Sequence, residues 1–222
     1  MRNRWFIALA SIGLHISIGS VYAWSVLTRP IMADMGFTLS QTTWTFSLAI
    51  LMLGLSAGFL GSFAEKIGPK KSGLLAMLFW VTGLLGTAYA LSIHNLTLLY
   101  LFYGIIGGIG LGIGYITPVS TLVKYFPNRP GFATGLAIMG FGFASLIAGP
   151  LMQYLVAQVE LVDTFIILGV IYLVVMGASS LYLKAPQPKQ PPRTTKDKST
   201  MYVHTHGMLA NDAMKTWQFG AL

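Results

Sequence analysis

Long apolar segments alternate with short polar segments over the first 183 residues of the chain. Six of the apolar segments are long enough for an α-helix to cross a bilayer, which takes roughly 20 residues. The pattern therefore predicts an all-α membrane protein with six transmembrane helices in residues 1–183. We expect these helices at residues 5–27, 44–63, 72–93, 97–123, 132–156 and 164–183.

The connections between the predicted helices carry the turn and charge signals. The first connection, TRPIMADMGFTLSQ, is the longest, and Ser40 at its end is predicted to cap the second helix. The composition changes after Leu183, where KAPQPKQPPRTTKDKST is rich in proline and lysine. We expect residues 184–213 to form a flexible cytoplasmic linker and residues 214–222 to begin a seventh helix that is cut short.

The distribution of positive charge predicts how the helices cross the membrane. If the N-terminus, the connections after the second and fourth helices and the tail share one side, that side holds every lysine and arginine of the 14 except Arg29. Positively charged connections stay in the cytoplasm, so we expect both termini there, in a multi-pass protein of the plasma or inner membrane. The alternative of a signal peptide over residues 1–24 is disfavoured, because that apolar run is long and lacks a small-x-small exit.

The composition supports a membrane location and excludes several chemistries. Of the residues, 55% are hydrophobic and 9% are charged, whereas an ordinary soluble domain has about 25% charged residues. The chain has no cysteine, which excludes disulfides and thiolate catalysis. The predicted helices hold no paired acids, no nucleophile beside a base and no metal cluster, so we expect no enzyme, no cofactor and no metal site. Membrane topology explains the net charge of +8 without a nucleic-acid partner.

The segment YGIIGGIGLGIGY, residues 103–115, contains six glycines. Placed on a helix at about 100° per residue, all six fall within one arc of roughly 200°. A phosphate-binding loop has no reason to sort its residues in this way, and the apolar sequence continues to Val123. We therefore predict a smooth packing face, with small-xxx-small spacing at Gly104, Gly108 and Gly112. The same role is predicted for Gly54, Gly58, Gly61, Gly131, Gly135, Gly140, Gly142 and Gly149.

The connection after the second predicted helix, GSFAEKIGPKKSG, resembles the signature loop of the major facilitator superfamily. The resemblance implies a charge-relay latch that closes the cytoplasmic side of a transporter. An ordinary positively charged loop is the alternative. Glutamate stands here at the acidic position, where aspartate is commoner. The residues that match are Gly61, Glu65, Lys66, Gly68, Lys70 and Lys71.

Three further segments resemble the oxalate/formate antiporter branch of this superfamily. They are NRWFIALASIGLHISIGSVYAWSVLTRPI, KYFPNRPGFATGLAIMGFGFAS and AMKTWQFGAL, which resemble the first helix, the entry to the fifth and the entry to the seventh. The resemblance covers nearly the whole chain but only about half of a twelve-helix transporter. It implies the N-terminal domain of a carrier of small organic anions, working by alternating access against a second six-helix domain.

The candidate substrate site combines spacing with this resemblance. On the first helix, His15 and Tyr22 belong to one polar stripe with Ser11 and Gly19, at steps of four, four and three. The resemblance implies that Tyr22, Tyr115 and Phe141 line a small-anion cavity, with phenylalanine at position 141 in place of tyrosine. Ser145 lies one turn beyond Phe141. The alternative for each residue is plain packing, and for His15 a neutral histidine bonded within the bundle.

Two further expectations concern the rest of the molecule. No lysine or arginine lies in the middle of a predicted helix, so the positive partners of an anion are expected from the second domain. Trp24 and Trp5 are predicted to lie in aromatic belts at the outer and inner interfaces. The alternative function is a non-transporting, half-length membrane protein that is a remnant or assembles with another chain.

Overall fold

A computed structural model describes residues 3–186, and every regular element in this range is a helix. Six helices in this range are long and apolar enough to cross a membrane, as the sequence predicts. The predicted linker beyond Pro186 and the predicted seventh helix lie outside the described residues. The helical elements are α1 (Arg4–Gly19), η1 (Ser20–Ala23), α2 (Trp24–Met35), α3 (Leu39–Ile67), α4 (Pro69–Ser92), α5 (Leu96–Leu99), η2 (Tyr100–Gly107), α6 (Gly108–Tyr125), α7 (Pro130–Gly142), α8 (Ala144–Gln158) and α9 (Leu161–Tyr182).

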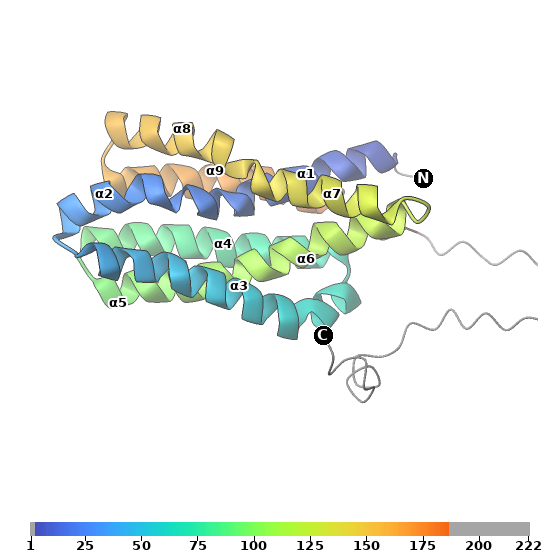
Figure 1. The fold of residues 1–222 in the computed structure, drawn as a ribbon, viewed down its shortest axis with the longest axis horizontal. Coiled ribbons are helices and arrows are strands. Elements are labelled where there is room, and N and C mark those ends of the chain that lie inside the picture. The colour runs from blue at the N-terminus through green and yellow to red at the C-terminus, as the bar shows by residue number, and fades with distance from the viewer. Residues whose placement is uncertain (1–2, 187–222) are drawn as a thin grey trace, which may run out of the picture. The chain divides into compact units, whose positions relative to one another are not determined.

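The helices run side by side as a bundle, and their connections gather at its two ends (Figure 1). The N-terminus, the α3–α4 turn and the α6–α7 connection lie at one end. The α2–α3, α4–α5 and α8–α9 connections lie at the other end. Every lysine and arginine of residues 3–186 except Arg29 belongs to the first end. The positive-inside rule therefore assigns this end to the cytoplasm.

The first span is longer than the sequence pattern predicted. Helix continues through η1 and α2 to Met35, with Pro30 inside it, and it ends at Gly36 in a left-handed conformation with φ of 68°. The next cap is Thr38 rather than Ser40. Its hydroxyl accepts from the Gln41 amide nitrogen while the Gln41 side chain accepts from the Thr38 amide, which makes a capping box. The predicted loop 28–43 is therefore mostly helix.

The glycine run packs as predicted, and it serves two neighbouring helices at once. A Cβ atom on Gly104 or Gly108 would meet α3 at Leu48 or Met52. On the other side of the same face, a Cβ on Gly110 would lie 2.7 Å from the Trp80 amide nitrogen of α4. Only a residue without a side chain permits backbones to approach so closely. The run lies in η2 and α6, and it is a packing surface for α3 and α4.

Several other glycines do not pack within the described bundle. A Cβ atom added to Gly54 or Gly58 on α3 would find nothing within 4 Å, and the same holds for Gly131, Gly135 and Gly142. The prediction that these glycines pack inside the bundle is therefore wrong for the described unit. Its physical reason is that sequence composition cannot tell a glycine that faces a neighbouring helix from one on an outer face. Gly61, Gly140 and Gly149 do have neighbours, among them Ile116, His15 and Val26.

Trp24 was predicted to face the outer interface, but it lies inside the bundle. Its side chain is buried, its indole Nε1 donates to the Thr42 carbonyl at 3.2 Å, and its ring lies 4.3 Å from that of Tyr103. Buried tryptophan needs such a hydrogen-bond partner. Trp5, at the cytoplasmic end of α1, is exposed as predicted.

Candidate functional site

Four of the predicted site residues meet in an aromatic cluster, which consists of His15, Tyr22, Tyr115 and Phe141. The Phe141 ring lies 5.1 Å from the Tyr22 ring and 5.1 Å from the Tyr115 ring, edge to face in both cases. The His15 ring stacks on Tyr115 at 5.6 Å and lies 5.8 Å from Phe141. The four residues come from three different spans, so the bundle brings together positions that are far apart in the sequence.

The short 3₁₀ segment η1 decides which way the first span presents its side chains. Ser11, His15 and Gly19 precede it and are buried, whereas Tyr22 lies within it and is 45% exposed. The predicted stripe therefore does not form one open face, because η1 winds more tightly than the 3.6 residues per turn assumed. Gly19 instead permits close contact with α7, since a Cβ there would collide with the Phe141 carbonyl oxygen.

His15 is held by the backbone of two other spans. Its Nδ1 lies 2.6 Å from the Ala137 carbonyl oxygen on α7, and its Nε2 lies 3.0 Å from the Tyr115 carbonyl oxygen on α6. Both partners are acceptors, and a neutral imidazole donates from one nitrogen only. The side chain is fully buried beneath Tyr115 and Phe141. His15 thus joins α1 to α6 and α7 as the buried member of the cluster and does not itself reach the surface.

The exposed side of the cluster offers hydroxyl groups. Among the contacts of residues 3–186, neither the Tyr22 nor the Tyr115 hydroxyl has a hydrogen-bond partner in the protein. Phe46 of α3, which the sequence analysis missed, lies beside Tyr22 with its ring 6.4 Å away. Ser145 is half-buried and lies on α8, beyond the break that separates Gly142 at the end of α7 from Ala144 at the start of α8. A phenol without a partner can donate a hydrogen bond to a carboxylate.

The signature loop is much tighter than the predicted connection. Only Gly68 separates α3 from α4, and its φ of 83° and ψ of 160° belong to a region that essentially only glycine adopts. Lys66, Lys70 and Lys71 are exposed around this turn at the cytoplasmic end. Gly61 lies on α3, and a Cβ atom there would lie 3.0 Å from the Ile116 side chain of α6.

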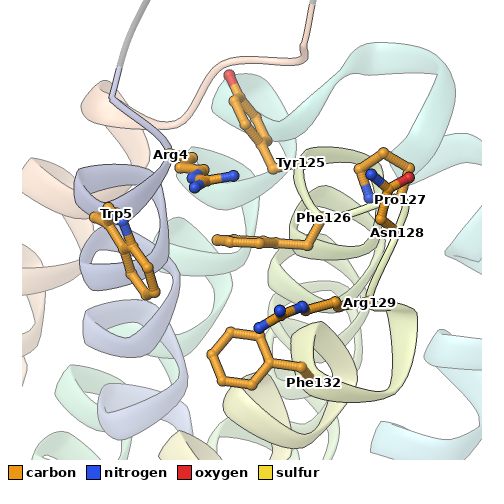
Figure 2. A pocket seen from close by; sticks show the side chains of 8 residues that line it. All are labelled: Arg4, Trp5, Tyr125, Phe126, Pro127, Asn128, Arg129 and Phe132. Atoms are coloured by element: carbon orange, nitrogen blue, oxygen red, sulfur yellow. The ribbon is translucent and has the colours of Figure 1, made fainter.

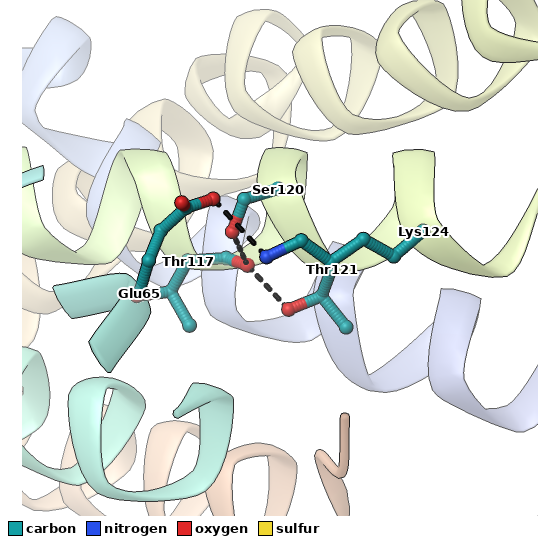
Figure 3. Close-up of polar contacts among 5 residues, drawn as sticks. All are labelled: Glu65, Thr117, Ser120, Thr121 and Lys124. Carbon is teal, nitrogen blue, oxygen red and sulfur yellow. Dashed lines mark hydrogen bonds and ion pairs between the residues drawn. The ribbon is translucent and has the colours of Figure 1, made fainter. Parts of the chain in front are cut away.

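Glu65 of this motif forms an ion pair across the cytoplasmic end of the bundle. Its Oε1 accepts from Lys124 Nζ of α6 at 3.1 Å, and Figure 3 shows the two side chains reaching toward one another. The side chains are 48% and 51% exposed, so the pair contributes about 0–1 kcal/mol. About two turns deeper on α6, the Thr117 hydroxyl bonds the Ser72 hydroxyl of α4 at 2.6 Å. The motif therefore ties α3 to α6 by a contact that is easily broken.

The interior of the spans is almost free of ionisable groups. More than two helical turns from either end of the six described spans, His15 is the sole His, Lys, Arg, Asp or Glu. Within the described part of the chain no three His, Asp or Glu residues gather as a metal site would require. A carboxylate placed against the cluster would meet phenol donors and aromatic edges, and it would need a cation from outside this unit.

The sequence matches the family profile described as Major Facilitator Superfamily over residues 6–218. It is 33% identical over 198 residues to an uncharacterized MFS-type transporter, YhjX, of Escherichia coli strain K12, covering 87% of this chain and 47% of the relative. It is 28% identical over 170 residues to human monocarboxylate transporter 14, covering 76% of this chain and 33% of that protein. It is 28% identical over 152 residues to the oxalate:formate antiporter of Oxalobacter formigenes, with 68% and 35% covered. The chain thus spans a third to a half of the length of these relatives.

Proposed function

This chain belongs to the major facilitator superfamily, a family of membrane transporters and not of enzymes, and from that premise we propose that it carries a small organic anion. It would act as the N-terminal half of an alternating-access transporter. The proposed substrate is oxalate, formate or a related mono- or dicarboxylate, since relatives include an oxalate:formate antiporter and monocarboxylate transporters. Such carriers bind substrate near the midplane, between two six-helix domains.

The observation that carries the proposal is the pair of unpartnered phenol hydroxyls in the aromatic cluster. Tyr22 and Tyr115 approach the same Phe141 ring from two different spans, so their hydroxyls can converge on one bound anion. Aromatic rings present a positive edge, and the Phe141 ring supplies such an edge without the hydroxyl of a tyrosine. His15 is proposed to position this arrangement from beneath, and Ser145 to border it on α8. Together these residues would recognise a carboxylate without neutralising it.

The missing positive charge and the open glycines both point to a second six-helix domain as the partner. An anion buried without a cation is prohibitively costly, and the described spans offer no lysine or arginine at mid-depth. The outer face of α3 exposes Gly54 and Gly58, and that of α7 exposes Gly135 and Gly142. Small residues on a membrane helix permit close approach of another helix. We infer that these two faces pack on the second domain and enclose the anion.

The signature motif is proposed to close the cytoplasmic side during the transport cycle. The Glu65–Lys124 pair contributes so little free energy that it can open and reform at each turnover. Gly68 holds α3 and α4 in a one-residue turn, which lets both helices move as a unit. The exposed positions Lys66, Lys70 and Lys71 would then contact the second domain or the membrane surface.

Removing single hydroxyls tests the proposed site without disturbing the ring packing. Tyr22→Phe and Tyr115→Phe should each weaken anion binding at least tenfold, because a hydrogen bond to a charged group contributes about 1.5–3 kcal/mol. Affinity is measured as the rise in melting temperature of the chain, purified together with the second six-helix domain that would supply the cation, on titration with oxalate, formate and lactate. This readout does not require transport.

Tyr89→Phe is the matched control, since Tyr89 is an exposed tyrosine near the C-terminal end of α4 and outside the aromatic cluster. It should bind the same anion with unchanged affinity. Equal affinity in Tyr22→Phe, Tyr115→Phe and the wild type would remove both hydroxyls from the site. Stabilisation by none of the three anions would contradict the proposed substrate class.

A further inference from the structure

A pocket at the cytoplasmic end of the bundle has no part in the proposed transport site. It encloses about 310 Å³, and its lining includes Arg4 and Trp5 at the start of α1, Phe126 and Arg129 in the α6–α7 connection, and Phe132 on α7 (Figure 2). The floor is aromatic, because the buried Phe126 ring lies 5.7 Å from Trp5 and 5.8 Å from Phe132. The pocket therefore combines two cationic side chains with an apolar, aromatic floor.

The two arginines carry uncompensated charge. In residues 3–186 the one ion pair is Lys124 with Glu65, so neither Arg4 nor Arg129 has a carboxylate within 4.0 Å. The Arg4 guanidinium carbon instead lies 5.6 Å from the Phe126 ring centre and 5.9 Å from that of Trp5. Figure 2 shows the Arg4 and Arg129 side chains on either side of Phe126 in that view. Guanidinium groups bind phosphate oxygens through paired N–H donors.

The depth of the pocket identifies the source of the phosphate. The pocket lies where the first span begins, the fourth ends and the fifth begins. Trp5 and Phe132 are 52% and 48% exposed there, and Phe6, the next residue of α1, is exposed as well. Exposed aromatic side chains at the ends of spans lie at the level of the lipid headgroups. A phosphate in this pocket is thus at the depth of lipid phosphates and not in the aqueous phase.

We propose that this pocket binds the phosphate of an anionic phospholipid from the cytoplasmic leaflet. Arg4 and Arg129 hold the phosphate oxygens, and the rings of Trp5, Phe126 and Phe132 hold the glycerol and the first methylenes of the lipid. The cytoplasmic leaflet is the anionic one, and each arginine near its surface contributes attraction. The bound lipid joins the start of α1 to the start of α7, the helices that carry His15 and Phe141.

The test is lipid binding to the purified full chain, measured by native mass spectrometry in a neutral detergent. Dioleoylphosphatidylglycerol should bind, and dioleoylphosphatidylethanolamine, with the same acyl chains and no net charge, should bind at least fivefold more weakly. Arg4→Gln and Arg129→Gln should each lower the affinity for phosphatidylglycerol about fivefold. Arg29→Gln, which removes the same charge at the other end of the bundle, should leave it unchanged.

Three results would overturn the proposal. The first is equal phosphatidylglycerol affinity in the wild type, Arg4→Gln and Arg129→Gln. The second is equal affinity of the wild type for the two lipids. The third is thermal stabilisation by inorganic phosphate as large as that by phosphatidylglycerol, which would make the pocket a site for soluble phosphate. If either glutamine variant fails to fold, Arg4→Lys and Arg129→Lys replace it, since they keep the charge. A loss of phosphatidylglycerol affinity smaller than fivefold in these variants supports the proposal, and no loss contradicts it.

Discussion

Leucine in place of Gly112 is expected to prevent the protein from folding to a stable, monodisperse state. A Cβ atom at position 112 would lie 2.5 Å from the Leu53 carbonyl oxygen and 2.8 Å from the Ala57 amide nitrogen of α3, and it would collide with the Ser56 hydroxyl. Backbone atoms cannot yield without moving the whole of α3. Overpacking a core costs about 1–3 kcal/mol or more, and a whole leucine side chain at a backbone contact should exceed this range.

Ile109→Leu, a volume-conserving change on the same helix, is the matched control and should cost less than about 1.5 kcal/mol. Leucine is also a better helix former than glycine by about 1 kcal/mol. A loss of stability in Gly112→Leu would therefore come from the contact with α3 and not from α6 itself. The readouts are thermal unfolding and the monodisperse fraction in detergent. Equal melting temperatures for wild type, Gly112→Leu and Ile109→Leu would contradict the packing role of the glycine run.

His15→Leu is expected to destabilise the bundle by about 2–3 kcal/mol while leaving its helix content intact. The substitution removes the contacts at 2.6 Å and 3.0 Å that join α1 to the carbonyl oxygens of Ala137 and Tyr115. A neutral His15 donates one hydrogen bond to these oxygens, which contributes about 1 kcal/mol net, and the loss of its ring contacts with Tyr115 and Phe141 adds about 0.5–1.5 kcal/mol each. Thermal or denaturant unfolding of the purified protein measures the loss.

Two amide substitutions show which of the His15 contacts matters. Asparagine at position 15 places a donor near the position of Nδ1, facing Ala137, and glutamine places one near that of Nε2, facing Tyr115. The variant that preserves the stronger contact should recover part of the lost stability. A His15→Leu protein as stable as the wild type would show that these contacts do not hold the three spans together.

The parts of the fold that follow from local periodicity could be predicted from the sequence. The six spans are long and apolar. Glycines of the run contact either α3 or α4, because their spacing follows the helical period. The end of the first span was predicted too early, because Pro30 suggests a break in the helix but lies within α2. The sequence signal for the start of α3 was the capping box of Thr38 and Gln41. Gly54 and Gly58 show a different limit, because whether a face is covered depends on neighbours that the sequence does not specify.

The candidate site could be predicted as a set of residues but not as an arrangement. Tyr22, Tyr115 and Phe141 do come together, yet the tight winding of η1 exposes Tyr22 while His15 remains buried. A single non-α turn changes the direction in which every later side chain points from the helix axis. No residue type in this segment predicts such a turn. Phe46 reaches the cluster from α3 through tertiary packing alone, and its own segment carries no signal of that contact.

We expect the face bordered by the aromatic cluster to be open to water and to bind an organic anion. The chain has no cysteine, so a single introduced thiol is the one group in it that a thiol reagent labels. Ser145, which is half-exposed on α8, is proposed to border the site, and its replacement by cysteine is nearly isosteric. Val174→Cys lies at an exposed position of α9, an apolar helix. Thiols react as thiolates, which require water.

The decisive measurement is therefore the rate at which a membrane-impermeant maleimide labels these two variants in membranes, with and without oxalate, formate or lactate. The account predicts that Ser145→Cys is labelled, that at least one of these anions slows its labelling, and that Val174→Cys stays unlabelled under both conditions. Labelling of Ser145→Cys that is as low as that of Val174→Cys, or that no anion slows, would contradict the account.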